Sequence, residues 1–269
     1  MAQKLPDFDK PPVSEVAMSV SFKPLSGWSS LQAGLFWSTV RKKYPQTETH
    51  PPIAVPVEKF GDDQWITPGV AFGFEADLAR FWFLTDDGTR LMQLQRDHFV
   101  INWRKVRGDE AYPRYAKEMR PRFEEEWALF AGFVDEAIGQ AVEPVQCELT
   151  YVNDVFRGEG WDNFEDALTL FSWWKDTERK FLPPASSMSV AIAFDYPDKK
   201  GRLHIDSRHV RRLTDSKEAY QIKLFARGAP RSGSTNHLLA WMDEAHEWIV
   251  KGFADVTSER AHGLWVRKQ

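Results

Sequence analysis

The feature that most constrains this chain is the alternation of apolar and polar residues in stretches that short turns separate. Residues 79–105 contain three such stretches, and residues 187–228 contain three more. A period of two residues is typical of a β-strand that buries one face and exposes the other. Because consecutive strands joined by short turns pair antiparallel, the sequence predicts an antiparallel sheet with one packed face and one polar face.

Segments with a helical period lie between these groups of strands. Helices are expected at residues 30–45, 115–137, 162–175 and 236–255. In the first of them Leu31, Leu35 and Val40 have near-helical spacing, which indicates the buried side of that helix. In the second, the predicted buried stripe consists of Phe123, Trp127, Phe130 and Val134.

Two further strands, at residues 14–22 and 146–154, complete a repeated order of elements in which each half reads strand, helix, three strands, helix. We therefore expect an α+β protein in which two pseudo-repeated halves form a mainly antiparallel sheet of about eight strands, with helices packed largely on one face. The expected boundaries are an extended N-terminal arm at 1–13, an N-terminal half at 14–140 and a C-terminal half at 141–269. One compact unit is expected, and two separate small α+β domains are the alternative.

Composition excludes several classes of protein. With a net charge of −4 and one cysteine, the chain has no global basic field for nucleic acid or anionic lipid and cannot form an intrachain disulfide. Cys147 lies in an apolar alternation and is expected to be a buried, inert thiol. The sequence shows no apolar stretch of signal-peptide type and no run that approaches the roughly 18 apolar residues of a membrane span. We expect a cytoplasmic protein that does not bind membranes.

The polar positions of the alternating strands are unusual in their chemistry. Amide, guanidinium and imidazole groups predominate over the Lys, Glu and Thr that are common on solvated faces, and such groups make directional hydrogen bonds. A polar face needs no ligand, since a sheet covered on one side faces water on the other. The functional alternative is a binding face that consists of Gln93, Gln95, Asn102, Arg104, Glu148, Arg202, His204, Asp206, Arg208, Gln221, Lys223 and Arg227.

Motifs for chemistry are weak. His204 and Asp206 could both bind a metal from one strand face, but no third ligand is evident. His246 and Glu247 begin like the helical zinc-protease motif, but Val250 stands where the second histidine is required. The sequence contains neither a phosphate-binding glycine loop nor a nucleophile elbow. We identify no catalytic residue and expect no metal and no cofactor.

Six stretches spread over nearly the whole chain carry a family resemblance: LPDFDKPPVSEVAMSVSF, GLFWSTVRKKYP, LMQLQRDHFVINWRK, YPRY, CELTYVND and HEWIVKGFADVTSERAHGLW. They resemble a sporadically distributed, uncharacterised bacterial family of roughly this length that has no assigned activity. The resemblance implies no catalytic residue, and the family's patchy distribution is similar to that of defence-linked or mobile genes. The family's polar-strand signature corresponds here to Gln93, Gln95, Asp97, Asn102, Trp103 and Arg104.

Three functions remain open. The first is a non-enzymatic binding or regulatory protein whose open polar face, or the groove between its halves, engages a protein partner such as an operon partner. The second is a small-molecule site or enzyme in the cleft between the halves, with charge supplied by Asp97, Arg104, Glu148, His204 and Asp206. The third is nucleic-acid binding on the sheet through Arg202, Arg208, Lys223 and Arg227. A homo-oligomer is also left open.

Overall fold

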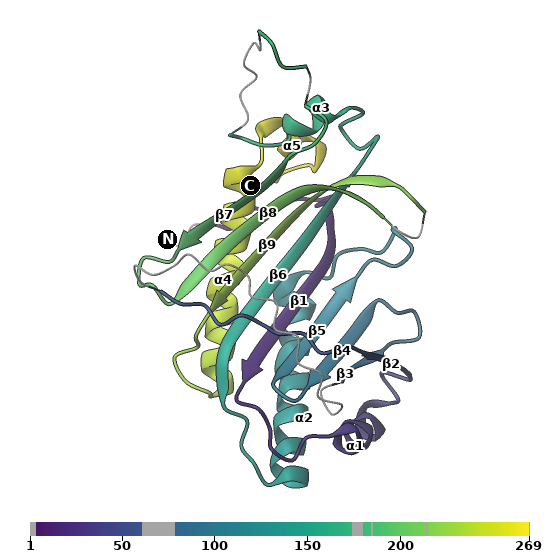
Figure 1. The fold of residues 1–269 in the computed structure, drawn as a ribbon, viewed down its shortest axis with the longest axis vertical. Helices are drawn as coiled ribbons and strands as arrows, with labels where there is room; N and C mark the ends of the chain where they lie inside the picture. The colour runs from purple at the N-terminus through teal and green to yellow at the C-terminus, as the bar shows by residue number, and fades with distance from the viewer. Residues whose placement is uncertain (1–3, 61–78, 174–179, 184, 213–214, 269) are drawn as a thin grey trace.

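The structure is a computed structural model that describes residues 4–60, 79–173, 180–183, 185–212 and 215–268. In this part of the chain nine strands form one antiparallel sheet in the order β2-β3-β4-β5-β1-β6-β9-β8-β7 (Figure 1). The strands are β1 (Val13–Phe22), β2 (Gln46–His50), β3 (Arg80–Leu84), β4 (Arg90–Gln95), β5 (His98–Arg104), β6 (Pro144–Phe156), β7 (Ser189–Asp195), β8 (Gly201–Arg211) and β9 (Glu218–Gly228). The predicted α+β class and antiparallel sheet are confirmed.

Five α-helices and one π-helical turn accompany the sheet in the described ranges. They are α1 (Ser30–Val40), η1 (Tyr115–Met119), α2 (Arg120–Ile138), α3 (Phe164–Leu168), α4 (Thr235–Val256) and α5 (Glu259–Leu264). Ser29 and Ser234 begin α1 and α4 because their hydroxyls accept backbone N–H groups of the first turn. Gly139 ends α2 in the left-handed region, at φ 70°, where a glycine is unstrained.

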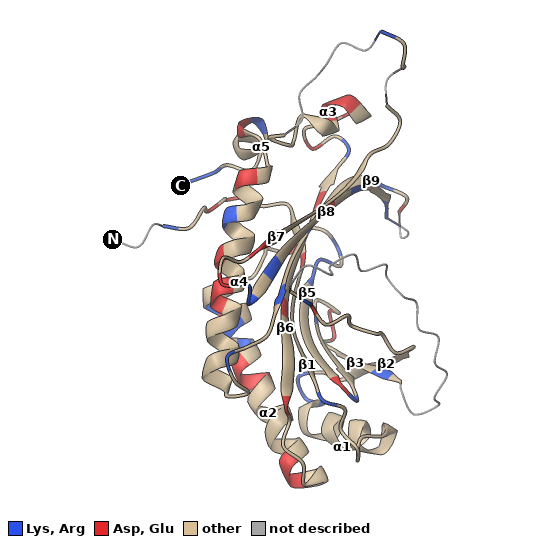
Figure 2. Cartoon of the chain, turned by 60° about the vertical axis from the view of Figure 1, so that its left-hand side comes forward, with Lys and Arg blue, Asp and Glu red and all other residues tan. Residues whose placement is uncertain are grey.

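The main core lies between the sheet and the two long helices. Helices α2 and α4 lie side by side on the same face of the sheet (Figure 2). The predicted stripe of α2 is confirmed: Phe123, Trp127, Phe130 and Val134 are all buried. Val16, Met18 and Val20 of β1, which have no exposed surface, belong to the same buried cluster. Each buried side chain of this size contributes roughly 1.5–3 kcal/mol through the hydrophobic effect, so this face is where the sheet is held to the helices.

Several elements differ from the expectation. Helix α1 buries Ala33, Phe36 and Val40, whereas Leu31 and Leu35 are 74% and 56% exposed. Phe36 packs against aromatic side chains of β3 and α2, and burial of this larger side chain turns the leucines outward. The helix expected at 162–175 spans only Phe164–Leu168, and residues 174 and 175 lie outside the described residues. Strand β2 and helix α5 were not predicted.

Cys147 is fully buried, as expected, and burial raises the pKa of its thiol. A thiol in this environment is a small apolar core residue. Where the structure is described, none of the helices is long and apolar enough to cross a membrane.

The face of the sheet opposite α2 and α4 is crossed by part of the connection from β2 to β3. We call residues 51–60 of this connection the strap; Figure 1 shows the strap running across the front of the sheet from the β2 side. Pro51, Pro52 and Pro56 keep the strap extended, since proline fixes its own φ and disfavours helix in the residue before it. The strap forms no strand of its own, so side chains hold it in place.

Candidate binding face of the sheet

The residues predicted from alternation lie on one face of the sheet, opposite α2 and α4. Side chains that are directly opposite each other on paired strands share a face of the sheet. This relation places all twelve residues on the same face when it is followed through the neighbouring strands β4, β5, β1, β6, β9 and β8. We call this surface the polar face. The structure therefore places every predicted site residue on one face of the sheet.

On the β3-β4-β5-β1 side, which we call the amide half, polar side chains satisfy one another across four neighbouring strands. Arg80 Nη1 donates to Gln93 Oε1 (3.1 Å), and Gln93 Nε2 donates to Asn102 Oδ1 (2.7 Å). Asn102 Nδ2 then donates to Glu15 Oε1 (2.6 Å). Burial raises the pKa of Glu15 despite this hydrogen bond. The sheet thus closes the side-chain amides of Gln93 and Asn102 into one network, whereas the buried Nε of Arg80 has no hydrogen-bond partner among the described residues.

On the β6-β9-β8-β7 side, the charged half, four ionic residues stand in one cross-strand row: Glu148, Arg227, Arg202 and Asp195. Arg227 Nε donates to Glu148, and Arg202 Nε lies 2.6 Å from Asp195 Oδ1. Arg227 and Arg202 are direct cross-strand neighbours, an arrangement that destabilises a sheet unless an anion lies between the two guanidinium groups.

Glu58 of the strap supplies that anion. Its carboxylate lies 2.9 Å from Arg202 Nη1, 2.6 Å from His204 Nε2 and 4.0 Å from Arg227 Nη1. The side chain of Glu58 is only 7% exposed and that of Arg202 only 8%. We call Arg202, His204 and Arg227 the cradle. A carboxylate buried to this degree needs several donors around it, and the cradle provides them.

Burial and charge act in opposite directions on the groups of this half. Burial alone raises the pKa of Glu148, but the Arg227 guanidinium and the Thr150 hydroxyl outweigh burial and hold that pKa below its ordinary value. Burial lowers the pKa of Arg202, yet Asp195 and Glu58 outweigh it and raise that pKa overall. Glu148 and Arg202 therefore remain charged near neutral pH, and the row keeps two cations at its centre with a carboxylate at each end.

Two glutamines hold the backbone of the strap. Gln95 accepts a hydrogen bond from the Ile53 N–H (2.9 Å) and donates one to the carbonyl oxygen of the same residue (3.0 Å). Gln146 accepts from the Glu58 N–H (2.8 Å) and donates to the Pro56 carbonyl oxygen (3.1 Å). Each glutamine amide therefore contacts both a donor and an acceptor of the strap backbone. These contacts fix the position of the strap and do not depend on the identity of its side chains.

The expectation that the polar face is open and wet is wrong in part. Gln93, Gln95, Asn102 and Arg202 are buried, because neighbouring polar groups and the strap cover them. Asp206, Gln221 and Lys223 are half-buried, Arg208 is exposed, and Arg104 is half-buried with its Nε donating to the Gly88 carbonyl oxygen (3.1 Å).

Sequence reasoning missed Glu58 and Gln146. Gln146 alternates with Glu148 in the stretch QCELTYVND, so the pattern that selected Glu148 could have selected it as well. Nothing in the proline-rich stretch around Glu58 distinguishes this carboxylate from an ordinary surface charge.

The alternative site between the halves is not formed by the residues predicted for it. Arg104, Glu148, His204 and Asp206 lie on the polar face, and Asp97 follows β4 in the tight turn to β5. Within the described ranges, no three His, Cys, Asp or Glu side chains form a group that could hold a metal ion.

In comparisons with known proteins, the chain matches no family model, no curated protein and no solved structure. The geometry of the polar face is therefore the basis on which a function can be inferred.

Proposed function

We propose that this protein is a non-enzymatic binding protein whose polar face holds an extended, carboxylate-bearing segment of a partner protein, in the place that the strap occupies. The observation that carries the proposal is the position of the Glu58 carboxylate among Arg202, Arg227 and His204. Two arginines that face each other across β8 and β9 require an anion, and a carboxylate on an extended chain fits between them.

The hydrogen bonds that Gln95 and Gln146 form with the strap indicate which features a partner segment must share with the strap. Gln95 and Gln146 contact backbone atoms at Ile53, Pro56 and Glu58, so any extended chain with a carboxylate at the Glu58 position could make the same hydrogen bonds. Proline favours such a conformation before binding and lowers the entropy lost on binding. The expected partner segment is therefore proline-containing, extended and acidic, and the strap acts as its competitor within the chain.

The pattern of charge favours a protein segment over nucleic acid. The basic residues of the third hypothesis share one face, but Glu148 and Asp195 stand beside Arg227 and Arg202 in the same row. A phosphate backbone would meet these carboxylates, and the local field is too balanced to attract a polyanion. The family resemblance suggests that the partner is a defence- or mobile-element-linked operon partner.

We also propose that the two halves of the chain are pseudo-repeats. The strand order supports this, because it reads β1, β5, β4, β3 outward from the centre in one direction and β6, β9, β8, β7 in the other. A long helix follows each set, α2 after β5 and α4 after β9. Under this arrangement the amide half and the charged half of the polar face are counterparts.

The test is binding of the strap sequence in trans. A labelled peptide of residues 51–60, PPIAVPVEKF, is titrated by fluorescence anisotropy against the Glu58→Ala protein, in which the internal carboxylate is removed. We expect saturable binding that weakens about tenfold or more when the peptide carries Gln in place of Glu, or when the protein also carries Arg202→Met, because each change removes a charge-assisted hydrogen bond.

The protein with native Glu58 is the matched comparison, and it should bind the peptide more weakly because its own strap competes. Equal binding by the Glu58→Ala and Glu58→Ala/Arg202→Met proteins, or no binding by either, would overturn the proposal. Thermal unfolding of each variant shows whether a loss of binding reflects a loss of folding.

A further inference from the structure

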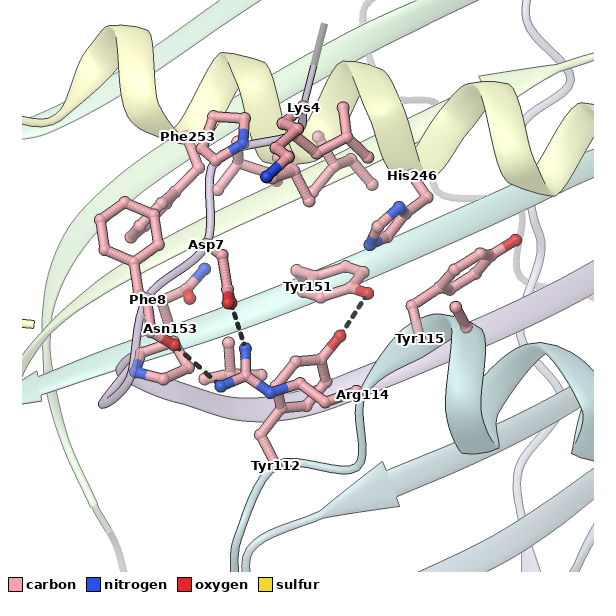
Figure 3. A pocket seen from close by; sticks show the side chains of 18 residues that line it. Lys4, Asp7, Phe8, Tyr112, Arg114, Tyr115, Tyr151, Asn153, His246 and Phe253 are labelled. Atoms are coloured by element: carbon pink, nitrogen blue, oxygen red, sulfur yellow. Dashed lines mark hydrogen bonds and ion pairs between the residues drawn. The ribbon is translucent and has the colours of Figure 1, made fainter. Parts of the chain in front are cut away.

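A second site lies on the opposite face of the sheet, and we propose that it binds a flat, mostly apolar, uncharged small molecule with one hydroxyl or carbonyl group. The site is a cavity of about 460 Å³ beneath the N-terminal arm (Figure 3). Small-molecule sites have volumes of roughly 300–1,000 Å³. No residue that lines the cavity belongs to the polar face, so this site does not depend on the function proposed above.

The cavity lies where η1 and α4 face each other above β6. Pro121 has no N–H and cannot donate the hydrogen bond that an α-helix requires from its position, and the chain makes the π-helical turn η1 immediately before α2. This turn places Tyr115 against His246 of α4, with ring centroids 4.1 Å apart and ring planes 11° from parallel. Such π-helical turns are frequent at functional sites.

The walls of the cavity are aromatic and aliphatic. Tyr151 of β6 lies beneath the space, as Figure 3 shows, and Leu224, Ile249 and Phe253 add apolar surface from β9 and α4. Flat rings on several sides favour a planar ligand, because offset-stacked and edge-to-face contacts add to the burial of apolar area.

A few polar groups converge on this apolar space. The hydroxyls of Tyr112 and Tyr151 lie 2.8 Å apart, which uses one of their two hydroxyl hydrogens and leaves the other to donate. Burial lowers the pKa of His246 to about 4, so its ring is neutral at pH 7 and offers one donor and one acceptor. Among the described residues, no hydrogen bond to either ring nitrogen of His246 is formed. One hydroxyl or carbonyl on a ligand matches this set.

Arg114 and Asp7, two charged residues that line the cavity, are paired with each other, which favours a neutral ligand. Arg114 Nη1 lies 2.8 Å from Asp7 Oδ1, and its Nη2 donates to the Phe8 carbonyl oxygen (2.9 Å). These contacts fasten the arm over the cavity, and the Asp9 N–H donates to the Val266 carbonyl oxygen (3.0 Å) to tie the arm to the C-terminal segment. Lys4 is exposed at the rim.

The experiment measures ligand-observed NMR titrations of three probes against the full chain: 2-naphthol, naphthalene and 2-naphthoate. We expect 2-naphthol to bind most tightly and 2-naphthoate most weakly. Val250→Phe, which fills the cavity from α4, should weaken 2-naphthol binding at least tenfold. Tyr151→Phe and His246→Phe keep a ring in place and should each weaken it several-fold through loss of a hydrogen bond.

Glu136→Ala, at an exposed position of α2 that does not line the cavity, is the matched control and should leave 2-naphthol binding unchanged. Ala116→Leu narrows the cavity from η1 at an exposed position and replaces Val250→Phe if that variant does not fold. Binding that neither cavity-filling variant weakens would overturn the site, and tighter binding of 2-naphthoate than of 2-naphthol would overturn the uncharged ligand class.

Discussion

The amide half and the charged half of the polar face bury polar groups in different ways. In the amide half, Gln93 and Asn102 find their partners on neighbouring strands and form a network that needs no other part of the chain. In the charged half, Arg202 and Arg227 face each other, and the strap contributes the carboxylate that lies between them. The Gln93–Asn102 network is closed within the sheet, whereas the anion between the two arginines comes from the strap, which also contacts Gln95 of the amide half.

This difference shows how to separate a structural polar face from a binding face. Amide pairs satisfy donor and acceptor together, so a ladder of amides can close without a ligand. Guanidinium groups have only donors, and two of them side by side leave a demand for an anion. A cross-strand pair of arginines such as Arg202 and Arg227 is therefore a stronger indication of binding than any number of buried amides.

The largest expected effect tests whether the amide half is structural. Asn102→Ala should lower the free energy of unfolding by about 2–4 kcal/mol, because it leaves the buried Gln93 amide without an acceptor and the half-buried Glu15 carboxylate without its donor. Chemical denaturation measures this loss. Gln221→Ala is the matched control, since it removes a half-buried amide on the same face, and it should cost less than about 1 kcal/mol. Equal losses would erase the distinction between the halves.

A second effect concerns pH. Burial lowers the pKa of His98 to about 4, and Ser21 Oγ lies 3.1 Å from its Nδ1. Because the pKa is lower in the folded state than in the unfolded state, the unfolded chain binds more protons between about pH 4 and 6.5, and stability falls as the pH falls through that window. His98 alone should account for a loss of about 2 kcal/mol from pH 7 to pH 5.

Denaturation curves at pH 7 and pH 5 measure this loss. The His98→Gln variant should lose less free energy of unfolding between pH 7 and pH 5 than the native chain. Part of the loss should remain, because burial also lowers the pKa of His246 to about 4. If the native chain and the His98→Gln variant lose the same free energy of unfolding, water reaches the imidazole. This edge of the polar face is then not closed.

The polar face could be predicted because alternation is a local property. The alternation within each strand shows which of its sides is apolar. Short turns, such as the one at Gly88, determine how neighbouring strands pair. Long helices were predictable for the same reason, since the stripe of α2 lies within one segment. Where two apolar stripes compete, as in α1, the sequence does not show that Phe36 rather than Leu31 packs inward.

Contacts that join distant segments could not be predicted. Glu58 reaches Arg202 across 144 residues, and no periodicity connects the two. The cavity beneath the arm depends on Tyr115 and His246, which separate elements bring together, and in the sequence His246 stood out only as part of an incomplete zinc-protease motif. Tertiary geometry, not local pattern, decides these contacts.

A smaller effect tests whether the strap is held locally. Glu58→Ala should lower the free energy of unfolding by about 1–2 kcal/mol, less than the roughly 3–5 kcal/mol that loss of one partner costs in an isolated buried pair, because Arg202 and Arg227 keep Asp195 and Glu148 as partners. Locally the change should be larger, with hydrogen exchange at the Ile53 and Glu58-position amides about tenfold faster. Unchanged exchange would mean that Gln95 and Gln146 alone hold the strap and that the cradle contributes nothing to it.

The smallest expected effect lies in the charged half beyond the cradle. The Lys223 ammonium is 4.5 Å from the centroid of the Phe225 ring, and among the described residues no carboxylate lies within 4.0 Å of it. A cation–π contact of this kind contributes about 0.5–1 kcal/mol, so Lys223→Ala should lower the free energy of unfolding by no more than that. A loss of unfolding free energy as large as that of Asn102→Ala would mean that the charged half also contains a closed hydrogen-bond network. The contrast between the Gln93–Asn102 network and a cradle that needs an anion would then fail.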